Sequence, residues 1–513
     1  MNGADLLIST LIANEVTTCF ANPGTSEMQF VAALDHHPQM RSVLCLFEGV
    51  ATGAADGYGR IAQSPACTLL HLGPGYGNGL ANLHNARRAF TPIVNIIGDH
   101  ATGHRSYDAP LHSDIEGIAA PNSLWVRSAE TADSVALLAA EAISASLAPP
   151  GGPVSLILPA DAAWNKADAQ PTIAQRRSWA GPAPEALGEA ARRIRAAGQP
   201  VVLIGGHACS EAGLAAAARI AATGVRVVAD TFIARLSRGA GRFAPHRIPY
   251  FGELAMEDLA GADLMVLAGT TQPVAFFAYP DRPSLLVPDG ASLCSIADRR
   301  EDAVAALEAL ADTLGAPSHG SSQPYDIADA APRGALTPHT AGVSIARHMP
   351  EGAIVCDDSV TSRTGLTMPA LTAAPHEVLA VTGGAIGEGL PLAIGAALAG
   401  PQRKVISMNG DGAAMYTVQS LWTMARERLD ILVIIMANGS YRILNNEMAR
   451  TSAGDAGPRA ARLLDLGDPR IGWVDLARGL GVEALRCDAA ETFDAAVAQA
   501  MRQRGPFLIE AVI

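Results

Sequence analysis

Short, almost entirely apolar runs recur along the chain, and Ala-rich stretches with helical spacing separate them. Strands that are apolar on both faces are typical of parallel sheets covered by helices on both sides. The alternation therefore predicts an α/β fold of doubly wound parallel sheets, in which ligands bind at the carboxyl ends of the strands. The expected strands are residues 16–20, 42–47, 66–72, 92–98, 153–159, 200–206, 226–230, 264–269, 353–358, 404–409, 431–438 and 506–513.

Two segments interrupt this pattern and are expected to be linkers, residues 166–186 and residues 314–338, of which the second is rich in Pro, Gly and Ser. A chain of 513 residues has room for about three domains. We therefore expect three doubly wound parallel-sheet domains, at residues 1–165, 185–313 and 336–513.

Charge and composition limit the possible partners. The net charge is −13 and no basic run stands out, which argues against a nucleic-acid partner. Hydrophobic residues make up 49% of the chain and charged residues only 17%, so little polar surface is left to cover the outside. We therefore expect a homo-oligomer with large buried interfaces.

The cysteines and the first residues bear on location. Seven cysteines are scattered without CxxC spacing, which indicates reduced, buried thiols in a cytoplasmic protein. The opening stretch MNGADLLIST has no basic region, so a signal peptide is not expected. No uncharged apolar stretch has the length of a membrane span, so a membrane partner is not expected either.

The stretch NGDGAAMYTV (409–418) places Asp411 between two glycines, after an expected strand and before an expected helix at 417–427. Gly410 and Gly412 allow a tight turn close to a ligand, and a helix N-terminus offers N–H groups to an anion. A carboxylate beside an anion requires a cation between them, and Mg²⁺ with oxygen ligands fits that requirement. A bare GDG is also often no more than a turn.

A second strand end lies 25 residues beyond this GDG, at Asn438-Gly439-Ser440. That length carries the chain through one helix and one strand to a neighbouring strand end. The Asp411 carboxylate, the Asn438 amide oxygen and the Ser440 carbonyl would then form half of an octahedral metal shell.

With this spacing, the chain resembles the thiamine-diphosphate enzymes of the 2-oxo-acid decarboxylase and acetolactate synthase superfamily. The resemblance implies a pyrimidine-binding, a central Rossmann-like and a diphosphate-binding domain, with thiamine diphosphate and Mg²⁺ as cofactors. It also implies a dimer or tetramer whose active sites lie between subunits. Two positions depart from the family pattern: Ala437 replaces the first of two asparagines, and Ala413 replaces a serine common in benzoylformate decarboxylases.

A second motif, LCLFEGVATGAADGYGR (44–60), places Glu48 at the end of an expected strand and before a helix of small residues. An isolated Glu in such a place usually caps the helix. The stretch is similar to the family segment whose glutamate hydrogen-bonds N1′ of the cofactor aminopyrimidine, which implies that role for Glu48. Phe47 stands where the family usually has His.

The resemblance assigns further residues to the cofactor. Ile386, in VTGGAIGEGLPLAIGAAL (381–398), stands where a bulky apolar residue bends the cofactor, although a core Ile would look the same. The other implied cofactor contacts are Ser359, Val360, Thr361, Gly384, Gly410, Gly412, Ala413 through its N–H, and Tyr441.

On the substrate side, FANPGTSEMQF (20–30) and LLHLGPGYGNGLANLHNA (69–86) are similar to benzoylformate decarboxylase segments. The register gives Thr25 the place of a catalytic serine and His71 that of a catalytic histidine, an acid–base group suited to neutral pH. A lone His at a strand end is more often structural. Other candidate substrate contacts are Ile443, Leu444 and Glu447, and also Phe276, Phe277 and Tyr279, two of which we expect to pack between domains.

The implied reaction is decarboxylation of a 2-oxo acid. The product is either released as an aldehyde or transferred, as an acyl-anion equivalent, to an acceptor aldehyde or ketone. One alternative is acetolactate synthase, which joins two pyruvates; FAD is not expected, because the middle block shows no convincing FAD motif. A second alternative is a non-catalytic homologue, which the joint presence of Glu48, Asp411 and Asn438 argues against. A plain nucleotide-binding protein ranks last, because no GxGxxG follows a strand.

Overall fold

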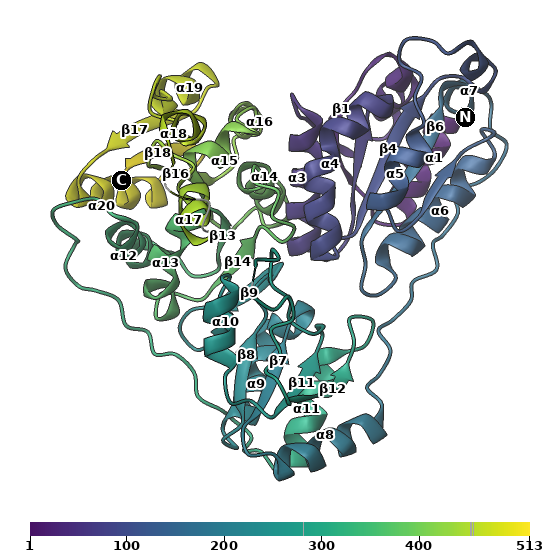
Figure 1. The fold of residues 1–513 in the computed structure, drawn as a ribbon. Coiled ribbons are helices and arrows are strands. Elements are labelled where there is room, and N and C mark those ends of the chain that lie inside the picture. Colours follow the sequence, from purple (N-terminus) through teal and green to yellow (C-terminus); the bar gives the residue numbers. More distant parts are fainter. Residues whose placement is uncertain (281, 452–453, 455) are drawn as a thin grey trace.

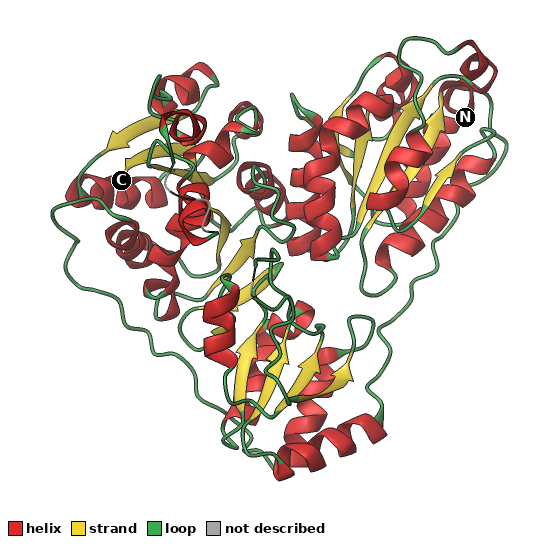
Figure 2. Ribbon diagram, in the orientation of Figure 1, coloured by secondary structure: helices red, strands yellow, loops and turns green. Residues whose placement is uncertain are grey.

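The computed structural model describes residues 1–280, 282–451, 454 and 456–513. These residues form three sheets with helices packed against them, and two long segments without helices link the parts (Figures 1 and 2). The predicted α/β fold with parallel sheets is confirmed.

The first sheet has six strands, all parallel. In spatial order these are β2 (Arg41–Leu44), β1 (Thr18–Asn22), β3 (Ala66–Leu70), β4 (Ile93–Asp99), β6 (Pro153–Pro159) and β5 (Val126–Ser128). The accompanying helices are α1 (Gly3–Ala13), α2 (Met28–Ala33), α3 (Glu48–Ala62), α4 (Leu72–Ala89), α5 (Ile115–Ala119), α6 (Ser134–Leu147) and α7 (Ala160–Trp164).

The second sheet has five parallel strands. They are, in spatial order, β10 (His246–Arg247), β8 (Arg226–Ala229), β7 (Pro200–Ile204), β11 (Leu264–Ala268) and β12 (Ser292–Ala297). Helices α8 (Pro184–Ala196), α9 (Glu211–Ala221), α10 (Gly252–Leu259) and α11 (Ala303–Leu314) accompany it.

The third sheet has seven strands: β17 (Glu483–Cys487), β18 (Phe507–Val512), β16 (Ile431–Ala437), β15 (Val405–Gly410), β13 (Ala353–Asp358), β14 (His376–Ala380) and β9 (Arg235–Arg238). Its helices are α12 (Pro338–His348), α13 (Thr364–Thr367), α14 (Gly389–Ala399), α15 (Asp411–Met415), α16 (Ser420–Glu427), α17 (Arg442–Arg450), α18 (Pro458–Leu464), α19 (Trp473–Gly479) and α20 (Ala490–Arg502). Strand β9 comes from the middle of the chain and pairs antiparallel with β14, so this sheet is not purely parallel.

Two element boundaries differ from the prediction. Strand β2 ends at Leu44, and Glu48 is the first residue of α3 rather than the end of a strand. Residues after Leu44 are apolar, and Phe47 is still extended, but it serves as the N-cap of the helix. The single helix expected at 417–427 is also wrong, because Asp411 already begins α15 and a turn separates it from α16.

Helices α3 and α14 bring the first and third sheets together, and glycines allow the contact (Figure 1). A Cβ on Gly57 would lie 2.0 Å from the Leu392 carbonyl oxygen, and one on Gly395 would lie 1.8 Å from the Ala54 carbonyl oxygen. Real atoms cannot approach so closely, so only glycine permits this packing of backbone on backbone.

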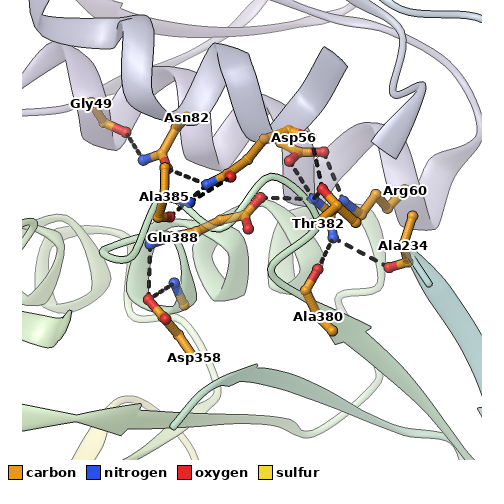
Figure 3. Close-up of polar contacts among 12 residues, drawn as sticks. Gly49, Asp56, Arg60, Asn82, Ala234, Asp358, Ala380, Thr382, Ala385 and Glu388 are labelled. Atoms are coloured by element: carbon orange, nitrogen blue, oxygen red, sulfur yellow. Dashed lines mark hydrogen bonds and ion pairs between the residues drawn. The ribbon is translucent and has the colours of Figure 1, made fainter. Parts of the chain in front are cut away.

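A buried ion cluster completes the junction (Figure 3). Arg60 on α3 lies 2.6 Å from Asp56 and 2.7 Å from Glu388, and all three side chains are almost fully excluded from solvent. Its guanidinium also donates to the carbonyl oxygens of Ala234, at 3.2 Å, and Ala380, at 2.7 Å. One side chain therefore joins the first block, the segment that leads into β9, and the third block.

Among the described residues, no helix is both long and apolar enough to cross a membrane.

We predict that Gly395→Ala lowers the urea midpoint and the free energy of unfolding, by about 1–3 kcal/mol, because the new methyl group forces α14 away from α3. Urea unfolding followed by circular dichroism measures the change. Gly188→Ala is the matched control, since Gly188 lies in α8 with no atom within 4 Å of the added Cβ. That change should be neutral or stabilising, by up to about 1 kcal/mol. Equal effects of the two substitutions would contradict the prediction.

Candidate active site

The loops of Asp411 and Asn438 meet at the carboxyl ends of neighbouring strands β15 and β16. The Asp411 carboxylate accepts the Gly439 N–H at 2.7 Å and the Gly412 N–H at 2.9 Å. The Asn438 amide oxygen accepts the Ser440 N–H at 2.9 Å. These bonds hold one carboxylate and one amide oxygen beside each other in a fixed turn.

Burial shapes the chemistry of this turn. It raises the pKa of Asp411, although the N–H groups of Gly439 and Gly412 act in the opposite direction. A carboxylate whose ionised form is disfavoured by burial gains most from a nearby cation. A Cβ on Gly412 would lie 2.4 Å from the ring of Tyr441. Glycine is therefore required at this position, and Tyr441 covers the turn.

The next strand, β13, ends in two carboxylates that face different partners. Asp357 accepts both the N–H (3.0 Å) and the hydroxyl (2.6 Å) of Ser359. One oxygen of Asp358 accepts three backbone N–H groups, from Gly387, Glu388 and Gly389, at 2.7, 3.0 and 3.2 Å. Asp358 therefore ties the loop that carries Ile386 to the loop that carries Val360 and Thr361.

Two residues of the strand-end loops have a backbone conformation that side chains disfavour. Val360 has φ +49° and Leu72, directly after His71, also has φ +49°. Positive φ is a true outlier for a bulky or β-branched residue and costs on the order of 1–3 kcal/mol. Such strain collects at functional sites, where the surrounding structure enforces it.

In the first block, Glu48 and His71 lie close to each other across Gly75. A Cβ on Gly75 would be 3.1 Å from the Glu48 carboxylate and 3.3 Å from the His71 Cβ. The Asn78 amide donates to the other Glu48 oxygen at 3.0 Å. Glu48 is buried, so its carboxylate is oriented at the start of α3 rather than exposed as a simple surface cap.

His71 has a carboxylate partner that the sequence analysis did not identify. Its Nδ1 lies 2.8 Å from a Glu27 oxygen, and that same oxygen accepts the Gly24 N–H at 2.7 Å. Glu27 is buried and also accepts the Ser26 hydroxyl. The carboxylate favours a proton on Nδ1, which leaves Nε2 as the free acceptor. The GTSE spacing, with Glu three residues after Gly24, was the available signal.

Thr25, the residue expected in the place of the catalytic serine, is placed differently from Ser26. It is exposed, whereas the Ser26 hydroxyl lies 3.3 Å from His71 Nδ1. The serine beside the histidine is therefore Ser26 in this chain, and Thr25 lies on the outer side of the same turn.

Within one chain, hydrogen bonds of Asn82 and Asn85 on α4 link the start of α3 to the loop of Ile386 (Figure 3). Glu48 begins α3, while Arg60 near its other end contacts Glu388 at the start of α14. At 1.5 Å per residue, Glu48 and Arg60 are separated by about 18 Å along the helix. Asn82 donates to the Gly49 carbonyl oxygen at 2.8 Å, and Asn85 donates to the Ala385 carbonyl oxygen at 2.7 Å, so the Glu48 end of α3 also lies near the Ile386 loop of its own chain.

Aromatic residues of the middle block pack against the third block. A Cβ on Gly384 would lie 2.5 Å from the Phe276 ring, so Phe276 contacts the loop that carries Ile386. The Tyr279 hydroxyl donates to Glu447 on α17 at 2.6 Å. Phe277 is exposed, with 54% of its surface accessible. Ile443 is half-buried and Leu444 is exposed.

Comparison with known proteins agrees with this geometry. Residues 1–119 match the family described as "Thiamine pyrophosphate enzyme, N-terminal TPP binding domain", and residues 364–511 match its C-terminal TPP binding domain. The chain belongs to the thiamine pyrophosphate enzyme family. The Glu48 and His71 loops lie in the first matched segment, and the Asp411 and Asn438 loops lie in the second.

Similarity to individual family members extends over the whole chain. A Mycobacterium tuberculosis protein, provisionally named acetolactate synthase large subunit IlvX, is 49% identical over 100% of this chain and 99% of its own length. Benzoylformate decarboxylase of Pseudomonas aeruginosa is 30% identical, with 96% of each chain covered. The structure of a Rhodococcus jostii thiamine diphosphate-dependent 4-hydroxybenzoylformate decarboxylase superposes with a TM-score of 0.86 at 25% identity, covering 100% of this chain and 99% of that one.

Asp358 provides a pH-dependent test of how the cofactor loops are held. Burial raises its pKa from the ordinary 3.8 to about 7, outweighing the three N–H groups that it accepts. Between pH 3.8 and about pH 7, Asp358 keeps its proton in the folded protein but loses it in the unfolded chain. The free energy of unfolding therefore decreases as the pH rises through this range.

We predict that Asp358→Asn, which keeps an oxygen acceptor but does not titrate, makes the free energy of unfolding decrease less steeply with pH. From pH 4 to pH 7 the wild type should lose stability relative to the variant, by at most about 1.4 kcal/mol per pH unit. Urea unfolding of both proteins across this range measures the difference. If the free energy of unfolding changed equally with pH in both proteins, Asp358 would not titrate between pH 4 and pH 7.

Proposed function

We propose that this protein is a Mg²⁺- and thiamine-diphosphate-dependent enzyme that decarboxylates a 2-oxo acid. The chain belongs to the thiamine pyrophosphate enzyme family, and its Asp411 and Asn438 loops are in contact. This contact, in which the Gly439 N–H donates to the Asp411 carboxylate at 2.7 Å, is the main support. The donor set fits the group: one buried carboxylate, one amide oxygen and the Ser440 carbonyl provide hard oxygen ligands for Mg²⁺, with diphosphate oxygens to complete the shell.

Bound thiamine diphosphate would supply the carbanion chemistry that lets the carboxylate of a 2-oxo acid leave as CO₂. The chain would hold the cofactor by its two ends. Asp411, Asn438 and Ser440 would hold the metal, and the turn backbone at Gly410, Gly412 and Ala413 would hold the diphosphate. The remaining proposed contacts are Ser359, Val360, Thr361, Gly384, Ile386 and Tyr441.

Glu48 is proposed to hold a proton at N1′ of the aminopyrimidine. One of its oxygens accepts from Asn78, so the other, beside Gly75, remains for the cofactor. His71 is the proposed acid–base group for the substrate, because Glu27 fixes its Nδ1 and leaves Nε2 free. Ser26, rather than Thr25, would accompany it, and Thr25 remains a candidate contact at the rim of the site.

We further propose a homo-oligomer, at least a dimer, in which Glu48 of one subunit serves the metal site of another. Membership of the thiamine pyrophosphate enzyme family, whose active sites lie between subunits, supports this arrangement. Exposed apolar side chains occur near both groups, Leu46 at 45% and Tyr416 at 56% accessible, and a second subunit would cover them. The seven free cysteines support a cytoplasmic location.

Acetolactate synthesis from two pyruvates is the second candidate, since the relative that is 49% identical carries that name. Incubation with a panel of 2-oxo acids, with and without an acceptor aldehyde, distinguishes the two functions. Acetolactate formed from pyruvate alone favours the synthase, and CO₂ with a free aldehyde favours the decarboxylase. Release of no CO₂ from any 2-oxo acid by the cofactor-loaded protein would overturn the proposal.

We predict that Asp411→Ala abolishes cofactor retention, because the metal loses its only charged protein ligand. Thiamine released on denaturation of protein purified in the cofactor and Mg²⁺ measures this directly. Asp289→Ala, an exposed aspartate outside the site, is the control and should retain as much thiamine as the wild type. Full retention by Asp411→Ala would exclude the proposed metal role.

We predict that Glu48→Gln and Asp411→Ala are each inactive but complement each other when co-expressed. In a mixed dimer, one of the two active sites then combines an intact Glu48 with an intact Asp411. Half of the dimers in a random mixture are mixed, so about a quarter of the wild-type activity should be recovered. Turnover of the best 2-oxo acid in the panel provides the measurement. If both residues acted within one chain, co-expression would recover nothing.

A further inference from the structure

A cavity of about 460 Å³ lies at the edge of the third sheet, and none of its lining residues is among those proposed to hold the cofactor. It lies between α19 and the paired strands β17 and β18, of which β17 is the outermost strand of the sheet (Figure 1). Arg486 and Glu510 line it from near the carboxyl ends of these strands, where parallel sheets bind ligands. Cavities of about 300–1,000 Å³ are typical of sites for small molecules.

The cations that line the cavity are all arginines: Arg470, Arg478 and Arg486. Arg478 on α19 donates to the carbonyl oxygen of Ala484 at 3.3 Å. Ala484 and Arg486 are two residues apart on β17, so their side chains lie on the same face of the strand. The guanidinium of Arg478 therefore lies over the same stretch of β17 that carries Arg486. Guanidinium groups that are close together repel each other, and an anion between them relieves the repulsion.

The carboxylate next to these arginines is Glu510, whose side chain is only 4% exposed. Its place in the sheet is opposite Arg486, and one of its oxygens lies 4.0 Å from Arg486 Nε and 3.8 Å from Arg470 Nη2. Both distances are too long for hydrogen bonds. Glu510 therefore holds the two guanidinium groups near it by charge, and these contacts leave their N–H donors free for a ligand.

The rest of the lining is mixed. One more carboxylate, Asp475, faces the cavity, so three positive and two negative residues line it, in a chain whose net charge is −13. Ile471, Val474 and Leu485 add apolar walls, and Leu485 is 38% exposed. Apolar walls gain from contact with an apolar group, which a bare inorganic ion does not provide.

We propose that this cavity is a second binding site, for a small organic molecule with an anionic head, a phosphate monoester or a carboxylate, and an apolar tail. Arg478 and Arg486 would bind the head, because a guanidinium presents paired N–H donors that match the oxygens of both groups. The tail would cover the apolar walls. The site goes beyond the proposed function, since none of its residues is assigned to the cofactor or the 2-oxo acid.

Calorimetry on the cofactor-loaded protein tests the site with three probes that share one branched tail: isopentyl phosphate, 4-methylpentanoate and the neutral 4-methylpentanamide. At least one of the two anions should bind with a Kd of about 1 mM or below, and at least about tenfold more tightly than the amide. The anion that binds more tightly identifies the head that the arginines prefer.

Arg486→Gln should weaken binding of that anion at least about tenfold, and Arg478→Gln should weaken it too. Arg502→Gln is the matched control, because Arg502 is exposed at the end of α20, outside the cavity, and its loss changes the net charge equally. Arg470 is a poorer test position. Burial raises the pKa of Asp411 and Arg470 acts in the opposite direction, so substitution of Arg470 would also disturb the turn of Asp411.

The side chain of Arg486 is 50% exposed, so Arg486→Gln should keep the fold, which circular dichroism checks. The inference is overturned if neither anion binds, if the amide binds as tightly as the anions, or if Arg486→Gln and Arg502→Gln have equal effects. None of these results depends on turnover, so the site and the proposed reaction are tested separately.

Discussion

The guanidinium of Arg60 is buried between two carboxylates that come from different parts of the chain, Asp56 on α3 and Glu388 at the start of α14. A buried cation is tolerated only when its partners are present and well oriented, so this contact fixes how α3 and α14 meet. Glu388 precedes Gly389, and both donate their N–H to Asp358. The placement of the Asp358 and Ile386 loops therefore depends on this ion cluster.

The same junction extends along α3 to the residues next to Glu48. Glycines let α3 press on α14, with Gly53 against Pro391 and Gly57 against Leu392. Within the first block the Glu48 end of α3 is well organised: Asn78 orients Glu48, and Glu27 orients His71. In the proposed dimer, this organised end of α3 would serve the metal site of the other subunit.

The sequence predicted those features whose signal is local. The parallel strands were visible as apolar runs, and the turn of Asp411 and Asn438 followed from strand ends at a fixed spacing. Strand β9, RLSR, was invisible because three of its four residues are polar, and its pairing partner, β14, comes from a distant part of the chain. The roles of Glu27 and Arg60 were not predicted for a related reason. Their partners, His71 and Glu388, are distant in sequence, and a single sequence does not show such pairs.

The Arg60 cluster also limits how the molecule can open. Because one guanidinium binds the first block, the approach to β9 and the third block at once, the first and third sheets are joined without a hinge at that point. Wide swings of whole domains would break several buried charged contacts together. Entry and exit of small molecules would then depend on movements of loops and side chains rather than of whole domains.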